Sequence, residues 1–159
     1  MKIVINSCFG GFSLSPAGVR RLAELNGREC YFFTNRAPDG SFNFEKNYPI
    51  DEKDTSELVW SAFDVPNPDE LIGVAKKGED GTYKDFNEVY NKHNLTSRPE
   101  DRADPKLIQV VEELGGDRRK GASGDCAALR IVEIPDGIEW EIDEYDGDES
   151  IEEVHQSWR

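Results

Sequence analysis

The stretch MKIVINSCFGGFSLSP, residues 1–16, joins an apolar run to a glycine-rich turn and a helix start. The apolar run at residues 3–5 predicts a buried strand, and Gly10 with Gly11 predicts the turn that follows it. Serine followed by proline is typical of a helix N-cap and the first helical position. The predicted helix runs to Gly27 and is marked by Ser15, Pro16, Val19, Leu22 and Ala23.

The glycine turn has two interpretations. A loop between a strand and a helix N-terminus lets backbone N–H groups approach a phosphate, and the helix dipole favours an anion there. The loop around Gly10 and Gly11 lacks, however, the Gly-x-Gly-x-x-Gly spacing and the Gly-Lys-Ser/Thr ending of known phosphate loops. The alternative is a plain turn in which the glycines supply positive φ angles.

Beyond the first helix, the sequence predicts one short strand and then a long irregular segment. Residues 29–34 are rich in aromatics and predict a strand that completes a β-α-β unit with the opening segment. Residues 36–100 contain many Pro and Asp-Gly turn signals, which predict an irregular insertion within a single domain spanning 1–159. Inside it, residues 71–75 fit either a strand or a helix, and the spacing of apolar residues over 86–90 predicts a short helix.

Regular structure returns at Asp104, where a second cap-and-proline signal predicts a helix that stops at Gly115-Gly116. A hairpin with a Pro-Asp-Gly turn and a short terminal helix are predicted after it, over 127–134, 138–143 and 150–159. This order predicts an α+β (or α/β) fold. It would be a two-layer domain with a mixed β-sheet, two main helices and a C-terminal β-hairpin.

The chain is strongly acidic, because 33 Asp and Glu against 19 Lys and Arg give a net charge of −14. Such a charge repels nucleic acid and anionic membranes, so any nucleotide ligand has to be small and held in a local basic pocket. The three cysteines form no Cys-x-x-Cys pair, which favours a reducing compartment. With no leader segment and no long apolar run, we expect a cytoplasmic protein that binds neither nucleic acid nor membrane.

The sequence predicts no metal ion, no cofactor and no catalytic residue. The acidic run between Asp136 and Glu153 fails the EF-hand pattern and is typical of a solvated surface. The two histidines, His93 and His155, are isolated in sequence from any serine or cysteine partner.

A basic cluster stands out against this acidic background. Arg118-Arg119-Lys120 precedes the small residues 121–124, and guanidinium groups grip phosphate oxygens in a bidentate fork. The alternative is a solvated loop whose charges complement the carbonyl end of the preceding helix. Arg98 and Arg102 are further candidates. Phe9 and Phe12 can supply a ring for stacking on a base, or they belong to the core.

Three strings of the chain resemble a group of small phage proteins. They are KIVINSCFGGFSLS at 2–15, DPKLIQVVEELGG at 104–116 and CAALRIVEIPDGIEWEIDEYDG at 126–147. Through this group the chain is similar to the first-described family of Thoeris anti-defence proteins. The resemblance covers roughly the first 35 and the last 55 residues, and residues 36–100 depart from it.

The resemblance implies a protein that sequesters nucleotides without being an enzyme. Members of that family are oligomers that bind the cyclic ADP-ribose isomers made by bacterial TIR-domain immune enzymes. Some of them also bind cyclic oligonucleotides from cGAS-like enzymes. Their pockets lie between subunits and use arginine and aromatic side chains, so the resemblance implies a homo-oligomer, a dimer or a hexamer.

On this basis we expect a phage protein that sequesters cyclic nucleotide immune signals and leaves them intact. The alternative is an acidic DNA mimic that occupies a host nuclease or repressor, and a phosphodiesterase is a weaker third candidate. The expected contacts are phosphate clamps, close backbone or hydroxyl contacts and a stacking ring. These candidate ligand-binding residues are Phe9, Gly10, Gly11, Phe12, Arg28, Arg98, Arg102, Arg118, Arg119 and Ser123.

Overall fold

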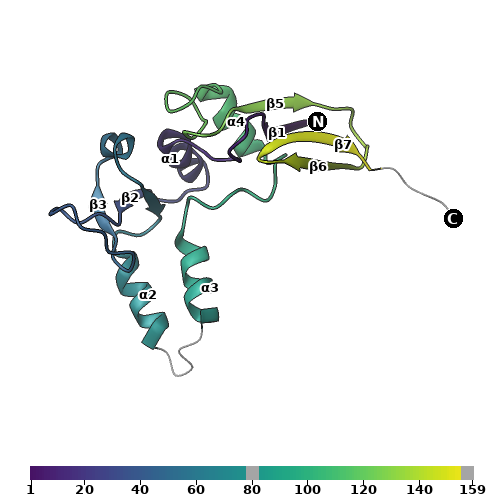
Figure 1. The fold of residues 1–159 in the computed structure, drawn as a ribbon. Coiled ribbons are helices and arrows are strands. Elements are labelled where there is room, and N and C mark those ends of the chain that lie inside the picture. The colour runs from purple at the N-terminus through teal and green to yellow at the C-terminus, as the bar shows by residue number, and fades with distance from the viewer. Residues whose placement is uncertain (78–82, 155–159) are drawn as a thin grey trace. The chain divides into compact units, whose positions relative to one another are not determined.

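The computed structural model describes residues 1–77 and 83–154 and confirms the α+β class (Figure 1). The described residues divide into two compact units. The first unit contains Met1–Leu22 and Arg98–Arg159, and the second contains Ala23–Ser97. The second unit is therefore inserted into the first along the sequence. That the whole chain behaves as one domain stays a prediction.

The first unit is organised around a central antiparallel strand pair. β1 (Lys2–Asn6) pairs with β5 (Leu129–Glu133), with Val4 opposite Ile131. Residues 3–5 of β1 are at most 1% exposed, because the strand is covered on both faces. α4 (Pro105–Leu114) packs on this pair through the fully buried Leu107 and Val110. Its start is the predicted one: the Asp104 carboxylate accepts a hydrogen bond from the Lys106 N–H at 2.9 Å.

α1 (Pro16–Leu25) also begins where the sequence predicts. The Ser15 hydroxyl accepts a hydrogen bond from the Gly18 N–H at 3.0 Å and donates one to the Gly121 carbonyl at 2.6 Å. The predicted β-α-β unit around this helix is wrong, because β1 pairs with β5 and not with β2 (Tyr31–Thr34). All three sheets of the described residues are antiparallel, where the sequence predicts one mixed sheet.

The C-terminal hairpin is confirmed, but its strands are not the two predicted at 127–134 and 138–143. It consists of β6 (Trp140–Tyr145) and β7 (Asp148–Glu153), joined by a tight turn. Asp146 and Gly147 have φ angles of 49° and 89°, and positive values at both positions suit the twist of a two-residue hairpin loop. The strand predicted at 127–134 pairs with β1 instead. The terminal helix predicted over 150–159 is also wrong, because residues 150–153 belong to β7; residues 155–159 lie outside the described part.

Gly147 can be tested directly, because its turn rests on the glycine loop after β1. A Cβ at Gly147 would meet the backbone nitrogens of Gly10 and Gly11 far inside van der Waals distance. We expect Gly147→Ala to lower the free energy of unfolding by about 2–5 kcal/mol, from backbone strain and overpacking together. Gly137→Ala is the matched control, since its φ is 83° and nothing lies within 4 Å of an added Cβ. Urea denaturation that gives equal losses for both variants would contradict the close packing of this turn.

The second unit holds more regular structure than its turn signals indicate. β2 is the middle strand of a sheet with β3 (Tyr48–Ile50) and β4 (Ser61–Phe63). A 3-10 helix, η1 (Glu52–Ser56), follows β3. α2 (Pro68–Lys77) resolves the strand-or-helix alternative at 71–75 in favour of helix, and α3 (Tyr83–His93) confirms the helix predicted over 86–90. The described residues thus contain four α-helices where two main ones are predicted.

Candidate functional site

Two loops of the first unit meet because β1 and β5 are neighbours. The loop that leaves β1 and the loop that enters β5 are joined by a hydrogen bond from the Ser7 N–H to the Ala128 carbonyl, 2.9 Å long. Six side chains from these loops make what we call the two-loop surface. They are Cys8, Phe9, Arg118, Arg119, Asp125 and Cys126.

Arg118 is the central cation of the two-loop surface. Its side chain is held by two contacts: Nε donates to the Ala127 carbonyl at 3.0 Å, and Nη2 lies 2.8 Å from the Cys8 sulfur. The residue is nevertheless exposed, and within the described residues no carboxylate pairs with it. Arg118 therefore presents a fixed positive charge to solvent in a chain of net charge −14.

Arg119 lies beside Arg118 but is paired. Its backbone φ is 60°, and its Nε donates to the Asp125 carboxylate at 2.6 Å. The hydrogen bond from Arg119 to Asp125 and their opposite charges raise the pKa of Arg119. The pair is exposed, so solvent screens it and a stronger anion can replace Asp125 as the partner.

The two phenylalanines named as stacking candidates differ in position. Phe9 is 63% exposed next to Cys8, so its ring is open to a ligand. Phe12 is only 8% exposed, and the Arg102 guanidinium stacks 3.8 Å from its ring centroid. Phe12 is thus a core residue with a cation–π partner inside the protein.

The remaining loop candidates serve the fold in this structure. The Gly10 N–H donates to the Asp146 carbonyl at 3.2 Å, so the hairpin turn covers the amide that the sequence offers to a phosphate. Gly11 lies under the same turn, against Gly147. The fully buried Ser123 donates its hydroxyl to the Gly116 carbonyl and accepts from the Leu129 N–H. The ligand contacts predicted for these residues stay predictions.

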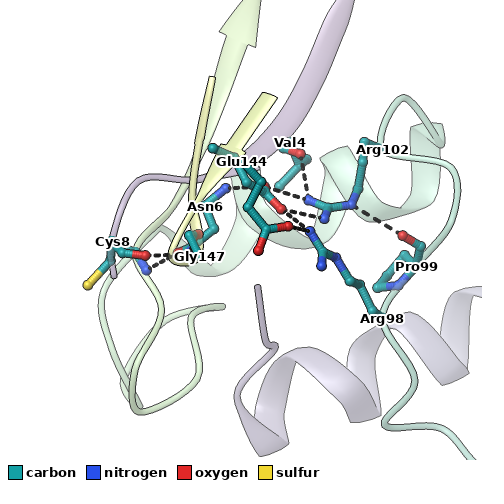
Figure 2. A network of polar contacts seen from close by, with 10 residues as sticks. Val4, Asn6, Cys8, Arg98, Pro99, Arg102, Glu144 and Gly147 are labelled. Carbon is teal, nitrogen blue, oxygen red and sulfur yellow. Dashed lines mark hydrogen bonds and ion pairs between the residues drawn. The ribbon is translucent and has the colours of Figure 1, made fainter. Parts of the chain in front are cut away.

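Arg98 and Arg102 meet at a buried carboxylate that the sequence analysis did not single out. The Glu149 side chain is fully buried and accepts hydrogen bonds from Arg102 Nη1 and Nη2, at 3.0 and 2.8 Å, and from the Asn6 N–H at 2.8 Å. Arg98 Nη2 contacts the same carboxylate and also bonds Glu144 at 3.1 Å (Figure 2). We call these five residues the Glu149 cluster.

The Glu149 cluster keeps its central carboxylate charged. Burial raises the pKa of Glu149, but hydrogen bonds from Arg102 and Asn6 and the charges of both arginines outweigh it, so the pKa lies below its ordinary value. Arg102 is 4% exposed and Arg98 is 46% exposed on its side chain. In this structure both expected phosphate clamps are therefore bound to a carboxylate of the protein itself.

Arg28 belongs to the second unit and has its own partners. Its Nη2 donates to Asp64 at 2.9 Å and to the Lys92 carbonyl at 2.8 Å. His93 Nδ1 lies 2.7 Å from the other oxygen of Asp64. Burial raises the pKa of Asp64. The hydrogen bonds and charges of Arg28 and His93 lower this pKa by more than burial raises it, so the net shift is downward. His93 is thus oriented by a carboxylate that its isolated place in the sequence does not reveal.

Within residues 1–77 and 83–154, no three His, Cys, Asp or Glu side chains gather as metal ligands. None of the helices in this part combines the length and the apolarity that a bilayer crossing requires. Comparisons with protein-family models, with curated proteins and with solved structures found no match.

Proposed function

We propose that the protein is a phage anti-defence protein that sequesters cyclic nucleotide immune signals in the host bacterial cytosol. The observation that carries this proposal is the exposed Arg118, which contacts Cys8, the residue before the exposed Phe9, and has no carboxylate partner in the described residues. A guanidinium binds phosphate oxygens in a bidentate fork, and an exposed ring adds stacking on a base. The resemblance to the Thoeris anti-defence family points to the same class of ligand.

The two-loop surface favours binding over cleavage. It contains no histidine, and its one carboxylate, Asp125, is paired with Arg119. Phosphodiester cleavage needs a positioned general base, a nucleophile or a metal that stabilises the developing charge. Charge pairing and stacking stabilise the bound nucleotide in its ground state and leave its bonds intact.

The test is a binding screen followed by recovery of the ligand. Isomers of cyclic ADP-ribose and cyclic dinucleotides are titrated into the protein by calorimetry, and we expect submicromolar binding of at least one. Overnight incubation with excess protein is then expected to hide that nucleotide from its receptor, and heat denaturation should return it unchanged on chromatography. A linear or hydrolysed product would move the protein to the phosphodiesterase class, and no binding to any nucleotide would reject the proposal.

A second candidate function rests on the outer face of the hairpin. The β6–β7 register places Glu141 directly opposite Glu152, and both are exposed. Like charges in such a cross-strand pair destabilise a hairpin, so their placement favours a cationic partner. The protein would then mimic nucleic acid and occupy a host DNA-binding protein. Capture of such a protein from host lysate at low salt, with loss at high salt, would distinguish this function from nucleotide binding.

A further inference from the structure

β5 has one edge that faces away from β1, and an unpaired edge is a template for another strand. The Met1 amino group donates to the Ile134 carbonyl at 2.7 Å, and the Ile134 N–H donates to the Met1 carbonyl at 2.9 Å. Every second residue of an antiparallel strand directs its backbone N–H and carbonyl groups to the same neighbour. The backbone groups of Val132, like those of Ile134, therefore point to β1, and those of Ile131 and Glu133 point away from it.

At two residues of β5, the backbone N–H and carbonyl groups that point away from β1 are available for hydrogen bonding. At the start of the strand, the outward Leu129 N–H donates to the Ser123 hydroxyl at 2.8 Å. Within the described part of the chain, the outward N–H and carbonyl groups of Ile131 and Glu133 have no such partner. Figure 1 shows β5 as the outermost strand on its side of the first unit.

The other edge of the same strand pair is closed. On β1, the Val4 N–H donates to the Arg102 carbonyl at 2.9 Å, and the Asn6 N–H donates to Glu149. The hairpin edges carry carboxylates, which repel a second copy of the same strand. These are Glu141, Asp143 and Glu144 on β6 and Asp148, Glu152 and Glu153 on β7.

The edges in the second unit are also protected. β4 is covered by the segment after α3, because the Leu95 N–H donates to the Ala62 carbonyl at 2.8 Å. β3 contains Pro49, and proline at an edge blocks strand addition because it lacks an N–H. Among the edges of the described sheets, β5 therefore has neither a covering segment nor a proline, and its two charged side chains, Arg130 and Glu133, are of opposite sign.

The geometry points to a second copy of this chain as the occupant of the β5 edge. Two β5 strands pair antiparallel about a two-fold axis at Val132, and Ile131 of one copy exchanges backbone hydrogen bonds with Glu133 of the other. The two-fold axis generates the same exchange between Glu133 of the first copy and Ile131 of the second. Both copies therefore contribute the same surface to the contact, which is isologous. The two-stranded sheet becomes the continuous sheet β1–β5–β5–β1, which is more stable than an isolated strand pair.

Charge also favours a second copy at this edge. The exposed charges on β5 are Arg130 and Glu133, so the strand is neutral in a chain of net charge −14. Ile131 and Val132 between them are half-buried and lose further apolar surface to water on pairing. The contact gives the proposed oligomer its interface, and it forms without the nucleotide.

The test compares Glu133→Pro with Glu133→Ala, both without nucleotide. Proline removes the outward N–H of residue 133 and leaves the hydrogen bonds to β1 in place, whereas alanine removes only the side chain. By light scattering we expect the natural chain and the alanine variant at twice the 18.0 kDa chain mass. The proline variant is expected to raise the dissociation constant of the dimer by about ten- to a hundredfold, because the symmetry removes two hydrogen bonds.

A second measurement needs no variant. Amide hydrogen exchange of Ile131 and Glu133 in the natural chain should slow as protein concentration rises, while exchange of the Val4 amide should not change. A natural chain that stays at 18.0 kDa, or a folded proline variant whose dimer dissociates on dilution no more readily than that of the alanine variant, would overturn the inference. Calorimetry of the proline variant with the nucleotides tests ligand binding separately, so the two proposals can fail independently.

Discussion

Glu149→Gln is expected to lower the free energy of unfolding by about 3–5 kcal/mol, the usual cost of removing one partner from a buried ion pair. The glutamine retains the size of the side chain but leaves Arg102, which is 4% exposed, without a counter-charge. It also weakens the acceptor for the Asn6 N–H at the end of β1. Urea denaturation followed by far-UV circular dichroism measures this loss.

The matched control is Glu152→Gln on the same strand. Glu152 is exposed and faces Glu141, so its neutralisation should change stability by less than about 0.5 kcal/mol or raise it slightly. A double variant, Arg102→Met with Glu149→Leu, should recover much of the lost stability because the buried charges are removed together. Equal effects of Glu149→Gln and Glu152→Gln would show that the Glu149 cluster contributes little.

The same comparison has a defined pH dependence. Because the pKa of Glu149 is lower in the folded protein than in the unfolded chain, its ionisation stabilises the fold above the unfolded pKa. That contribution is lost as pH falls through the folded pKa. The stability difference between the natural chain and Glu149→Gln should therefore be constant near neutral pH and shrink in acid. A difference that grows in acid would contradict the direction of this shift.

Reversing both charges on the two-loop surface, with Arg118→Glu and Arg119→Glu, is expected to weaken nucleotide binding by about 3–6 kcal/mol. Charge-assisted hydrogen bonds are worth about 1.5–3 kcal/mol each, so the dissociation constant should rise by about two to four orders of magnitude. Arg118→Ala alone should cost more than Arg119→Ala, because Arg119 first has to leave Asp125. Calorimetry with the nucleotide found in the screen measures each loss.

Lys46→Glu controls for the change in net charge. Lys46 lies in the second unit, over the Tyr48 ring, so its reversal lowers the total charge by the same amount as each single arginine reversal and changes no residue of the two-loop surface. Its effect on affinity should be a small, salt-sensitive one. If the double variant binds as the natural chain does while remaining folded, the phosphate contacts lie elsewhere.

The sequence could predict the elements whose signals are local. α1 and α4 begin at a capping residue followed by proline, and these signals lie within a few residues of each other. The pairing of β1 with β5 joins residues more than a hundred positions apart, and the alternation in β5 does not identify its partner. The Pro-Asp-Gly stretch before β6 therefore predicts a hairpin turn that the structure does not form, and the hairpin turn lies at Asp146-Gly147.

The candidate site was predictable only in part, for the same reason. The basic cluster at Arg118 is visible because it is contiguous in an acidic chain. Glu149 is one of many acidic residues near the C-terminus, and its burial depends on Arg98 and Arg102, about fifty positions earlier. Pairing β7 with β6 in register would have placed Glu149 opposite Glu144, on the inner face of the hairpin.

The insertion of the second unit into the first has a consequence for synthesis on the ribosome. Residues 23–97 are complete long before β5 and β7 emerge, so the second unit can fold while the first still waits for its last strands. During that interval β1 has no strand partner, and its wholly apolar centre, Ile3, Val4 and Ile5, is open to water and to other chains. Such long-range closure is slow. The newly made chain therefore passes through a stage in which its N-terminus is the segment most prone to aggregation.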